Sequence, residues 1–352
     1  MKTFIRATGN ISPQPSFGHG ALLQQIVPQT GNRLCCAEPD YLKYIDAKAI
    51  RRMSRIIKMG VAAAMECLQE AAVQNPDAIV MGTAYGCLDD TGIFLKKMAE
   101  QNEEMLTPTA FIQSTHNTIG AQVALLLQCH NYNNTFVHRG FSFESALLDA
   151  VMLLEEGAAT TVLAGAADEI TDYSHALLSR FGLYKKDPVT NTDLFSHASK
   201  GTIAGEGAAF FLLDKQASGN DYAALEAVQT FYKPGGSGEV AARVLAFLQE
   251  QSLTAADIDL VITGRNGDIT SDAVYQSLVN TVFSQHAIAH YKQFSGEYPT
   301  STAFALWMAA GILKQGTVPA SLGIASPEKL QRVLIYNHYQ NIHHSLMLVS
   351  AC

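Results

Sequence analysis

Apolar and polar positions along this chain follow the two periods that distinguish strands from helices. A strand is expected over Thr135–Val137, and the chain then breaks at Gly140. The helix that follows has its apolar residues spaced to form one face, at Ala146, Leu147, Ala150, Val151 and Leu154. Gly157 ends this helix, and the run VLAGAA behind it predicts a second buried strand.

The same order of elements occurs twice in the sequence. Leu68-Gln69-Glu70 ends an apolar helix and leads into DAIVMGTAYGCLDD, while Leu248-Gln249-Glu250 ends another and leads into DLVITGRNGDITSD. A buried helix is expected after each copy, STHNTIGAQVALLL in the first and YPTSTAFALWMAAGIL in the second. The repeat predicts two similar halves, residues 1–217 and 218–352, joined near residues 215–221.

Composition is typical of a large α/β protein. With 48% hydrophobic and 16% charged residues, the chain can bury a sizeable core in one or two domains. Short apolar runs such as AIVMG and TVLAG alternate with helices, which favours mostly parallel buried sheets.

The cysteine content and the net charge indicate the cellular compartment and the class of partner. Six cysteines without a CxxC pair favour a reducing compartment, and no apolar run has the length of a signal peptide or a membrane span. We therefore expect a cytoplasmic protein. The net charge of -8 disfavours a nucleic-acid partner.

The turn at Gly140 has the form of an active-site elbow without a nucleophile. Several α/β enzyme families present a serine or cysteine where a strand turns sharply into a helix, because the helix N-terminus stabilises negative charge there. In this chain the elbow holds glycine.

Four segments together resemble the β-ketoacyl synthases, the condensing enzymes of fatty acid and polyketide synthesis. That family has a strand, Thr-Ala-Cys, a helix and a strand ending Ala-Gly-Gly, which Ala164–Ala166 matches as AGA, so the cysteine position falls on Gly140. IDAKAIRRMSRIIKMGVAAAMECLQEA resembles the family's first long helix, and QSTHNTIGAQVALLL the helix before the elbow strand. Ser196–Asp214 is similar to the signature Asp-x-x-Arg-x-Gly-Phe-x-x-Gly-Glu-Gly. The resemblance covers nearly all 352 residues and implies a thiolase-like, duplicated αβαβα fold of five layers.

The remaining catalytic positions of that family are altered as well. Its first histidine, which opens a His-Gly-Thr-Gly-Thr loop, falls on Gly264. The motif Lys-x-x-x-Gly-His reads KQFSGE, so Lys292 is kept and Glu297 replaces the second histidine. The glycine-rich C-terminal loop is matched only by NHYQNIHHSL, which keeps Asn337 and is two residues shorter.

These substitutions remove the groups that condensation needs. A thiolate must accept the acyl chain, and two imidazoles must donate hydrogen bonds to the enolate formed when malonyl thioester loses carbon dioxide. Gly140 and Gly264 supply neither, and an ionised Glu297 would oppose the developing charge. We expect Glu297 to pair with Lys292 instead. The resemblance thus predicts a member without condensing activity, and it calls for no cofactor and no metal.

Such a cysteine-less member most resembles the chain-length factors, which pair with a competent synthase and shape the tunnel that measures the growing chain. Tunnel candidates are Phe136, Phe141 and Phe143. Condensing enzymes form dimers through the strand before the elbow, which implies an interface at Asn133, Asn134, Thr135, Phe136, Val137 and His138. Chain-length factors usually carry glutamine at the cysteine position, so Gly140 argues against a decarboxylation that depends on glutamine.

The resemblance also implies an acyl carrier protein as a partner. Such carriers are typically acidic, so docking would need a local basic patch. Arg51, Arg52, Arg55 and Lys58 on one helix could form it, although a solvated helix face is the commoner explanation for such a charge run.

Two other functions are open at this point. The chain could be an acyltransferase or synthase that uses Ser142 as nucleophile with His116 or His138 as base, although a serine in a first helical turn more often caps the backbone. It could also be a stand-alone protein that binds acyl chains. His338, His343 and His344 fit no known zinc spacing and are expected to be loop histidines.

Overall fold

The computed structural model describes residues 2–18, 22–197 and 199–352, so Ala198 within the Ser196–Asp214 signature lies outside the described residues. Its strands are β1 (Thr3–Ile11), β2 (Thr30–Gly31), β3 (Ala78–Gly82), β4 (Tyr132–Phe136), β5 (Thr161–Asp168), β6 (Val189–Thr190), β7 (Gly207–Asp214), β8 (Ala223–Tyr232), β9 (Leu260–Thr263), β10 (Ala287–His290), β11 (Arg332–Tyr339) and β12 (His343–Ser350). The α-helices are α1 (Arg55–Ala71), α2 (Leu88–Glu100), α3 (Pro108–Gln113), α4 (Thr118–Leu127), α5 (Ser142–Glu155), α6 (Asp172–Arg180), α7 (Ser237–Glu250), α8 (Ile269–Val282), α9 (Lys292–Ser295) and α10 (Thr302–Gln315).

Ten strands form one sheet in the order β10-β9-β11-β12-β8-β1-β7-β5-β3-β4. Outward from its centre, each half of this sheet has the same sequence of pairings. β1 pairs antiparallel with β7 and β7 with β5, whereas β5, β3 and β4 run parallel. β8, β12, β11, β9 and β10 repeat that pattern. The two halves are joined where β1 meets β8, through Thr3–Ile5 alone.

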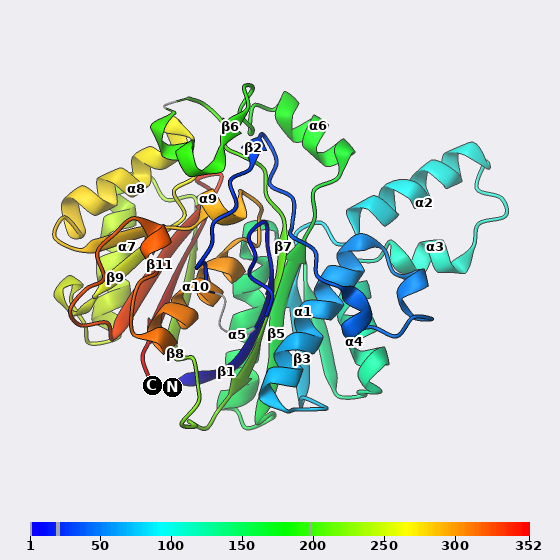
Figure 1. The fold of residues 1–352 in the computed structure, drawn as a ribbon, viewed down its shortest axis with the longest axis horizontal. Helices are drawn as coiled ribbons and strands as arrows, with labels where there is room; N and C mark the ends of the chain where they lie inside the picture. The colour runs from blue at the N-terminus through cyan, green and yellow to red at the C-terminus, as the bar shows by residue number, and fades with distance from the viewer. Residues whose placement is uncertain (1, 19–21, 198) are drawn as a thin grey trace.

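Helices lie between and outside the two half-sheets. α5 and α10 pack into a core together with apolar side chains from both half-sheets, including Val80 of β3 and Ile262 of β9. α1 and α4 form a second core on the outer face of the first half, and α7 and α8 form a third on the outer face of the second. Figure 1 shows these helices around the strands. The predicted five-layer αβαβα fold is therefore confirmed.

The expectation of mostly parallel sheets is wrong. β7 runs antiparallel to both of its neighbours, β5 and β1, and β12 runs antiparallel to both β11 and β8. An all-apolar strand indicates burial on both faces, and it carries no information about direction. The tight turn between β11 and β12 forces those two strands to be antiparallel.

The sequence paired the wrong helices of the two copies as counterparts. α10 follows β10 and lies in the central layer, so its counterpart is α5, which follows β4, and α4 corresponds to α8. α4 packs on α1 as α8 packs on α7. Both α4 and α10 are apolar along much of their length, which made them look equivalent.

Two element boundaries differ as well. The first long helix begins at Arg55, because the segment before it forms a 3-10 turn at Ile50–Arg52 rather than an α-helical turn. The strand before the elbow begins at Tyr132 and ends at Phe136, so Val137 lies just outside it.

The predicted boundary at residues 217 and 218 lies in the connection between β7 and β8 and remains a prediction. Within the described residues, no helix is both long and apolar enough to span a membrane.

Candidate active site

The elbow lies between β4 and α5, at the 3-10 turn Arg139–Phe141. Arg139 has a φ of 50°, in the left-handed region that costs a non-glycine residue energy. Ser142 follows as the first residue of α5, and both Gly140 and Ser142 are buried. The chain thus makes the strained strand-to-helix turn that the sequence predicts.

Space at Gly140 is already occupied. A Cβ atom built there would lie 2.7 Å from Cβ of Tyr339 and 2.9 Å from Cβ of His343. These are the first atoms of their side chains, so they cannot rotate away without moving the β11–β12 hairpin. A side chain at this position would overlap with the hairpin.

Gly264 is enclosed in the same way at the end of β9. Its N–H donates to the carbonyl of Tyr336 at 3.0 Å. A Cβ atom there would lie 2.1 Å from Oδ1 of Asn337 and 2.7 Å from the hydroxyl of Tyr275. Tyr291 donates to the same Oδ1 at 2.9 Å. Polar side chains therefore fill the place where the resemblance expects a histidine.

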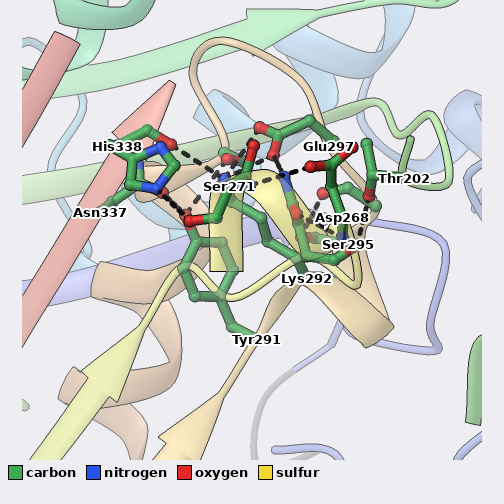
Figure 2. Close-up of polar contacts among 12 residues, drawn as sticks. Thr202, Asp268, Ser271, Tyr291, Lys292, Ser295, Glu297, Asn337 and His338 are labelled. Carbon is green, nitrogen blue, oxygen red and sulfur yellow. Dashed lines mark hydrogen bonds and ion pairs between the residues drawn. The ribbon is translucent and has the colours of Figure 1, made fainter. Parts of the chain in front are cut away.

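Lys292, the first residue of α9, forms a buried ion pair with Glu297, which lies two residues beyond the end of that helix. Nζ of Lys292 lies 2.7 Å from Oε2 and 2.9 Å from Oε1 of Glu297, and it also donates to the carbonyl of His338 at 3.3 Å. Asn266 donates to Oε2 of Glu297 at 2.6 Å. Burial raises the pKa of Glu297, and Lys292 opposes the rise. Figure 2 shows Lys292 between Glu297 and the strand that carries Asn337 and His338.

Gly140, Gly264 and Lys292 all meet residues 337–343 at the β11–β12 turn. Gln340 and Asn341 have φ values of 55° and 53°, which makes the turn tight. Tyr339 pairs with His343 across it. The structure thus brings the predicted site residues together, and the segment that the sequence matches to the family's glycine-rich loop forms a short hairpin.

A cavity of about 230 Å³ remains beside Glu297. Most of its lining is polar, from Tyr184, Thr202, Asn266, Asp268, Ser271 and Glu297. The cavity is unfavourable for an anion, because the carboxylates of Asp268 and Glu297 both line it. No nucleophile stands at Gly140, and the ammonium of Lys292 is held by Glu297, so the groups that would stabilise an enolate are missing or engaged.

Comparison with known proteins agrees with the fold. Residues 30–181 match the family model of the β-ketoacyl synthase N-terminal domain. This match covers less than half of the chain, so it shows a similarity to the family over that region. No curated protein sequence matches it.

Solved structures of this family superpose on the whole chain. A β-ketoacyl synthase from Burkholderia phymatum STM815 gives a TM-score of 0.79 at 16% identity, covering 100% of this chain and 99% of that one. The ishigamide ketosynthase/chain length factor gives 0.76 at 15% identity, with coverages of 100% and 99%. A ketosynthase in complex with its chain length factor from Xenorhabdus doucetiae gives 0.73 at 16%, with 100% and 98%. At these identities the likeness establishes the fold.

Ser142 is engaged by the elbow's own backbone. Its Oγ atom donates to the carbonyl of Arg139 and accepts from the N–H of His138, each at 2.8 Å. His138 contributes its main chain, and no hydrogen bond joins a described histidine ring to this hydroxyl. The geometry is that of a cap, as the commoner interpretation expects.

The three tunnel candidates are packed against other rings. Phe141 makes edge contacts with His343 and His138, and Phe143 lies 5.8 Å from Phe211 in the central core. Phe136 is half-buried at the edge of that core. Their assignment to an acyl tunnel remains a prediction.

The C-terminal histidines belong to the hydrogen-bond network of the hairpin. Nδ1 of His338 accepts from the N–H of Asn341, and Nε2 donates to the carbonyl of Ser271. Tyr336 bonds to Nδ1 of His344. Among the residues that the structure describes, no three histidine, cysteine or acidic side chains are grouped as metal ligands.

The proposed basic patch is not on one helix. Arg51 and Arg52 lie in the 3-10 turn before α1, and the guanidinium of Arg55 is bound to Glu38 and to both oxygens of the buried Glu206. Glu206 also accepts the backbone N–H groups of Cys36 and Ile170. Arg55 therefore holds loops together and contributes little to a docking surface for an acyl carrier protein.

Sequence reasoning did not find the residues that hold the site closed. Asn266 orients Glu297, and Tyr275 donates toward the loop carbonyl of His338 and accepts from its N–H. Glu144 is fully buried four residues after Gly140, close to Thr302 and Ser345. Glu144 was visible as an acidic residue on the apolar face of a predicted helix, whereas Asn266 and Tyr275 carry no such signal.

Proposed function

We propose that this chain is a non-condensing, chain-length-factor-like subunit that pairs with a cysteine-bearing ketosynthase in fatty acid, polyketide or aryl-polyene type synthesis. One observation carries the proposal: the space for a nucleophile at Gly140 is filled by the first side-chain atoms of Tyr339 and His343. Because the hairpin backbone fixes the positions of these two Cβ atoms, the site has no room to accept an acyl thioester.

The surface around β4 supports a partner subunit. β4 is an edge strand, and unpaired edges are sites for pairing with another chain. Exposed apolar side chains gather on β4 and on the helices that contact it, namely Leu125 of α4, Tyr132 and Val137 of the strand segment, and Leu148 and Met152 of α5. The interface assignment of Asn133–His138 fits this surface, although Asn133 and Asn134 themselves are polar.

The helix pair α2–α3, on the same side of the molecule, also exposes apolar side chains. α2 and α3 pack on each other and contain no buried residue. In Figure 1 they extend away from the body of the molecule, next to α4. Ile93, Leu95, Phe111 and Ile112 remain exposed on them. A helix pair with this much exposed apolar surface is expected to contact another subunit.

The superposed structures support the kind of partner. They include a ketosynthase with its chain length factor, and an acyl carrier protein in complex with its ketosynthase. By this likeness the substrate-bearing partner of the pair is an acyl carrier protein, and the compartment is the cytoplasm.

Association tests the proposal. We expect the chain, co-expressed with cysteine-bearing ketosynthases encoded beside it, to purify as a heterodimer in native mass spectrometry. Val137→Glu places a charge at the edge strand and should abolish the heterodimer. Leu245→Glu is the matched control, because Val137 and Leu245 are 47% and 48% exposed and Leu245 lies on α7. A chain that stays a monomer or homodimer with every candidate would overturn the proposal.

A further inference from the structure

Helices α2 and α3 and the loop between them form an arm, residues 88–113, which extends from the body of the molecule in Figure 1. Neither helix contains a buried residue. The exposed apolar side chains of the arm are Ile93, Leu95, Met105, Phe111 and Ile112. An exposed apolar surface of this kind marks a contact with another molecule.

The tip of the arm is acidic, and its backbone is strained. Asn102, Glu103 and Met105 have φ values of 48°, 65° and 52°, in the left-handed region that is costly for residues other than glycine. Glu103 and Glu104 are exposed, and no ion pair joins either of them to another described residue. Met105, the next residue, is 92% exposed. The tip thus presents two carboxylates and an apolar side chain to solvent.

A groove of about 510 Å³ lies between α3, α4 and the segment before α1. Lys48 and Arg52 line this groove and are exposed, and in the described part of the chain no ion pair joins them to an acidic side chain. Asp46 also lines it, but its Oδ1 accepts the N–H groups of Lys48 and Ala49. The apolar part of the lining is Ala49, Ile112, Leu125 and Leu126. The groove therefore combines apolar side chains with a net positive charge.

Tip and groove are complementary in charge and polarity, but they do not meet within one chain. α2 has 13 residues and is about 20 Å long, and the tip lies at its far end. Two copies placed side by side with their arms antiparallel would bring each tip to the groove of the other copy. A twofold arrangement of this kind makes every contact twice, and it closes, so that association stops at the dimer.

We propose that this arm joins the chain to a second copy of itself, in a dimer in which the two copies exchange arm tips. Glu103 and Glu104 of each copy pair with Lys48 and Arg52 of the other. Met105 packs on the apolar lining of the groove, and the exposed apolar side chains of the two arms cover each other.

This dimer goes beyond the proposed function and does not depend on it, because it forms from the chain alone. The groove shares Leu125 with the apolar surface around β4 that is proposed to receive the ketosynthase. A second copy and a ketosynthase therefore compete for this position, and the homodimer is the form expected without the other subunit.

Sedimentation velocity of the isolated chain tests the dimer, and charge reversal locates it. The groove variant Lys48→Glu/Arg52→Glu places like charges opposite each other at both contacts, and so does the tip variant Glu103→Lys/Glu104→Lys. Each variant should dimerise at least tenfold more weakly than the wild type. All four side chains are exposed, so both variants should keep the wild-type midpoint of thermal unfolding.

A mixture of the two variants gives the sharpest result. In a mixed dimer, the wild-type tip of one copy meets the wild-type groove of the other, and the reversed tip meets the reversed groove. Opposite charges then face each other at both contacts. We expect a mixed dimer with an affinity within about threefold of the wild type, identified by its mass in native mass spectrometry.

Arg180→Glu/Lys186→Glu is the matched control, because it reverses two exposed cations at and beyond the end of α6, outside the arm and the groove. It should dimerise as the wild type does. Four results would overturn the proposal: a wild type that stays monomeric at every concentration, unchanged affinity in the groove or tip variant, a mixture that does not recover, or a control as weak as the groove variant.

Discussion

Lys292 and Glu297 lie five residues apart in the chain and form a salt bridge with no exposure of the lysine side chain, 2.7 Å from Nζ to Oε2. The resemblance to the condensing enzymes predicts that their second histidine corresponds to Glu297. By that correspondence, a carboxylate in place of the histidine makes the lysine one half of an ion pair. The pair stabilises a closed site, since an unpaired ammonium at this depth would be costly.

Breaking this pair on one side should destabilise the fold. Glu297→Gln leaves the Lys292 ammonium buried without a counter-ion, and we expect a loss of about 3–5 kcal/mol in the free energy of unfolding. Urea denaturation at neutral pH measures it. The double variant Lys292→Met/Glu297→Leu removes both charges and should recover most of the loss. A loss below about 1 kcal/mol for Glu297→Gln would show that the pair contributes little.

Restoring a thiol at the elbow should fail. In Gly140→Cys the new Cβ would overlap with Cβ of Tyr339 and of His343, and overpacking of this kind costs about 1–3 kcal/mol. We expect a lower midpoint of thermal unfolding and no acyl adduct in intact-mass measurement after incubation with acyl thioesters.

Gly92→Cys provides the control for that experiment, because a Cβ at Gly92 of α2 meets nothing within 4 Å. Its midpoint should equal that of the wild type or exceed it. A Gly140→Cys protein as stable as Gly92→Cys, and acylated, would mean that the hairpin leaves room for a nucleophile.

Glu144 should make stability depend on pH. Burial raises its pKa from 4.5 to about 7, and Thr302, Ser345 and Lys292 limit the rise. The folded protein therefore holds a proton that the unfolded chain releases above pH 4.5, and stability falls as the pH rises from there to 7. Glu144→Gln should be equal to the wild type near pH 4.5 and more stable by about 3 kcal/mol at pH 8.

Urea denaturation of both proteins between pH 4.5 and 8 gives this difference, with the exposed substitution Glu100→Gln as a control that should show no trend. A constant difference between wild type and Glu144→Gln over that range would contradict the assignment of a protonated Glu144.

We expect Ser142 to stabilise the elbow and to take no part in a reaction. Ser142→Ala removes the acceptor for the N–H of His138 and the donor to Arg139, at a cost of about 1 kcal/mol. Neither the wild type nor the variant should gain mass with acyl thioesters. An adduct on the wild type that disappears in Ser142→Ala would assign the nucleophile to this serine.

Fold and site differ in how much the sequence reveals. The elbow at Gly140, the buried helix after it and the repeated strand-helix order follow from hydrophobic spacing, which is a local property. Strand direction does not, because β7 and β12 are as apolar as the strands beside them and only the connections decide their orientation.

The closing of the site is a property of distant contacts. The sequence shows Gly140 and Gly264 at positions where the resemblance expects a cysteine and a histidine. The pairing of Lys292 with Glu297 follows from their opposite charges within one matched motif. The hairpin that fills the space brings Tyr339 and His343 to Gly140 from about 200 positions away in the chain, which no local pattern encodes.

Carbon–carbon bond formation by the isolated chain tests the central claim most directly. The purified protein is incubated with acyl-primed and malonyl-loaded carrier protein, and mass spectrometry measures the β-ketoacyl product. We predict no product from the chain alone, and product once a cysteine-bearing ketosynthase partner is added. Product formed by the isolated chain, with contaminating synthases excluded, would contradict the account.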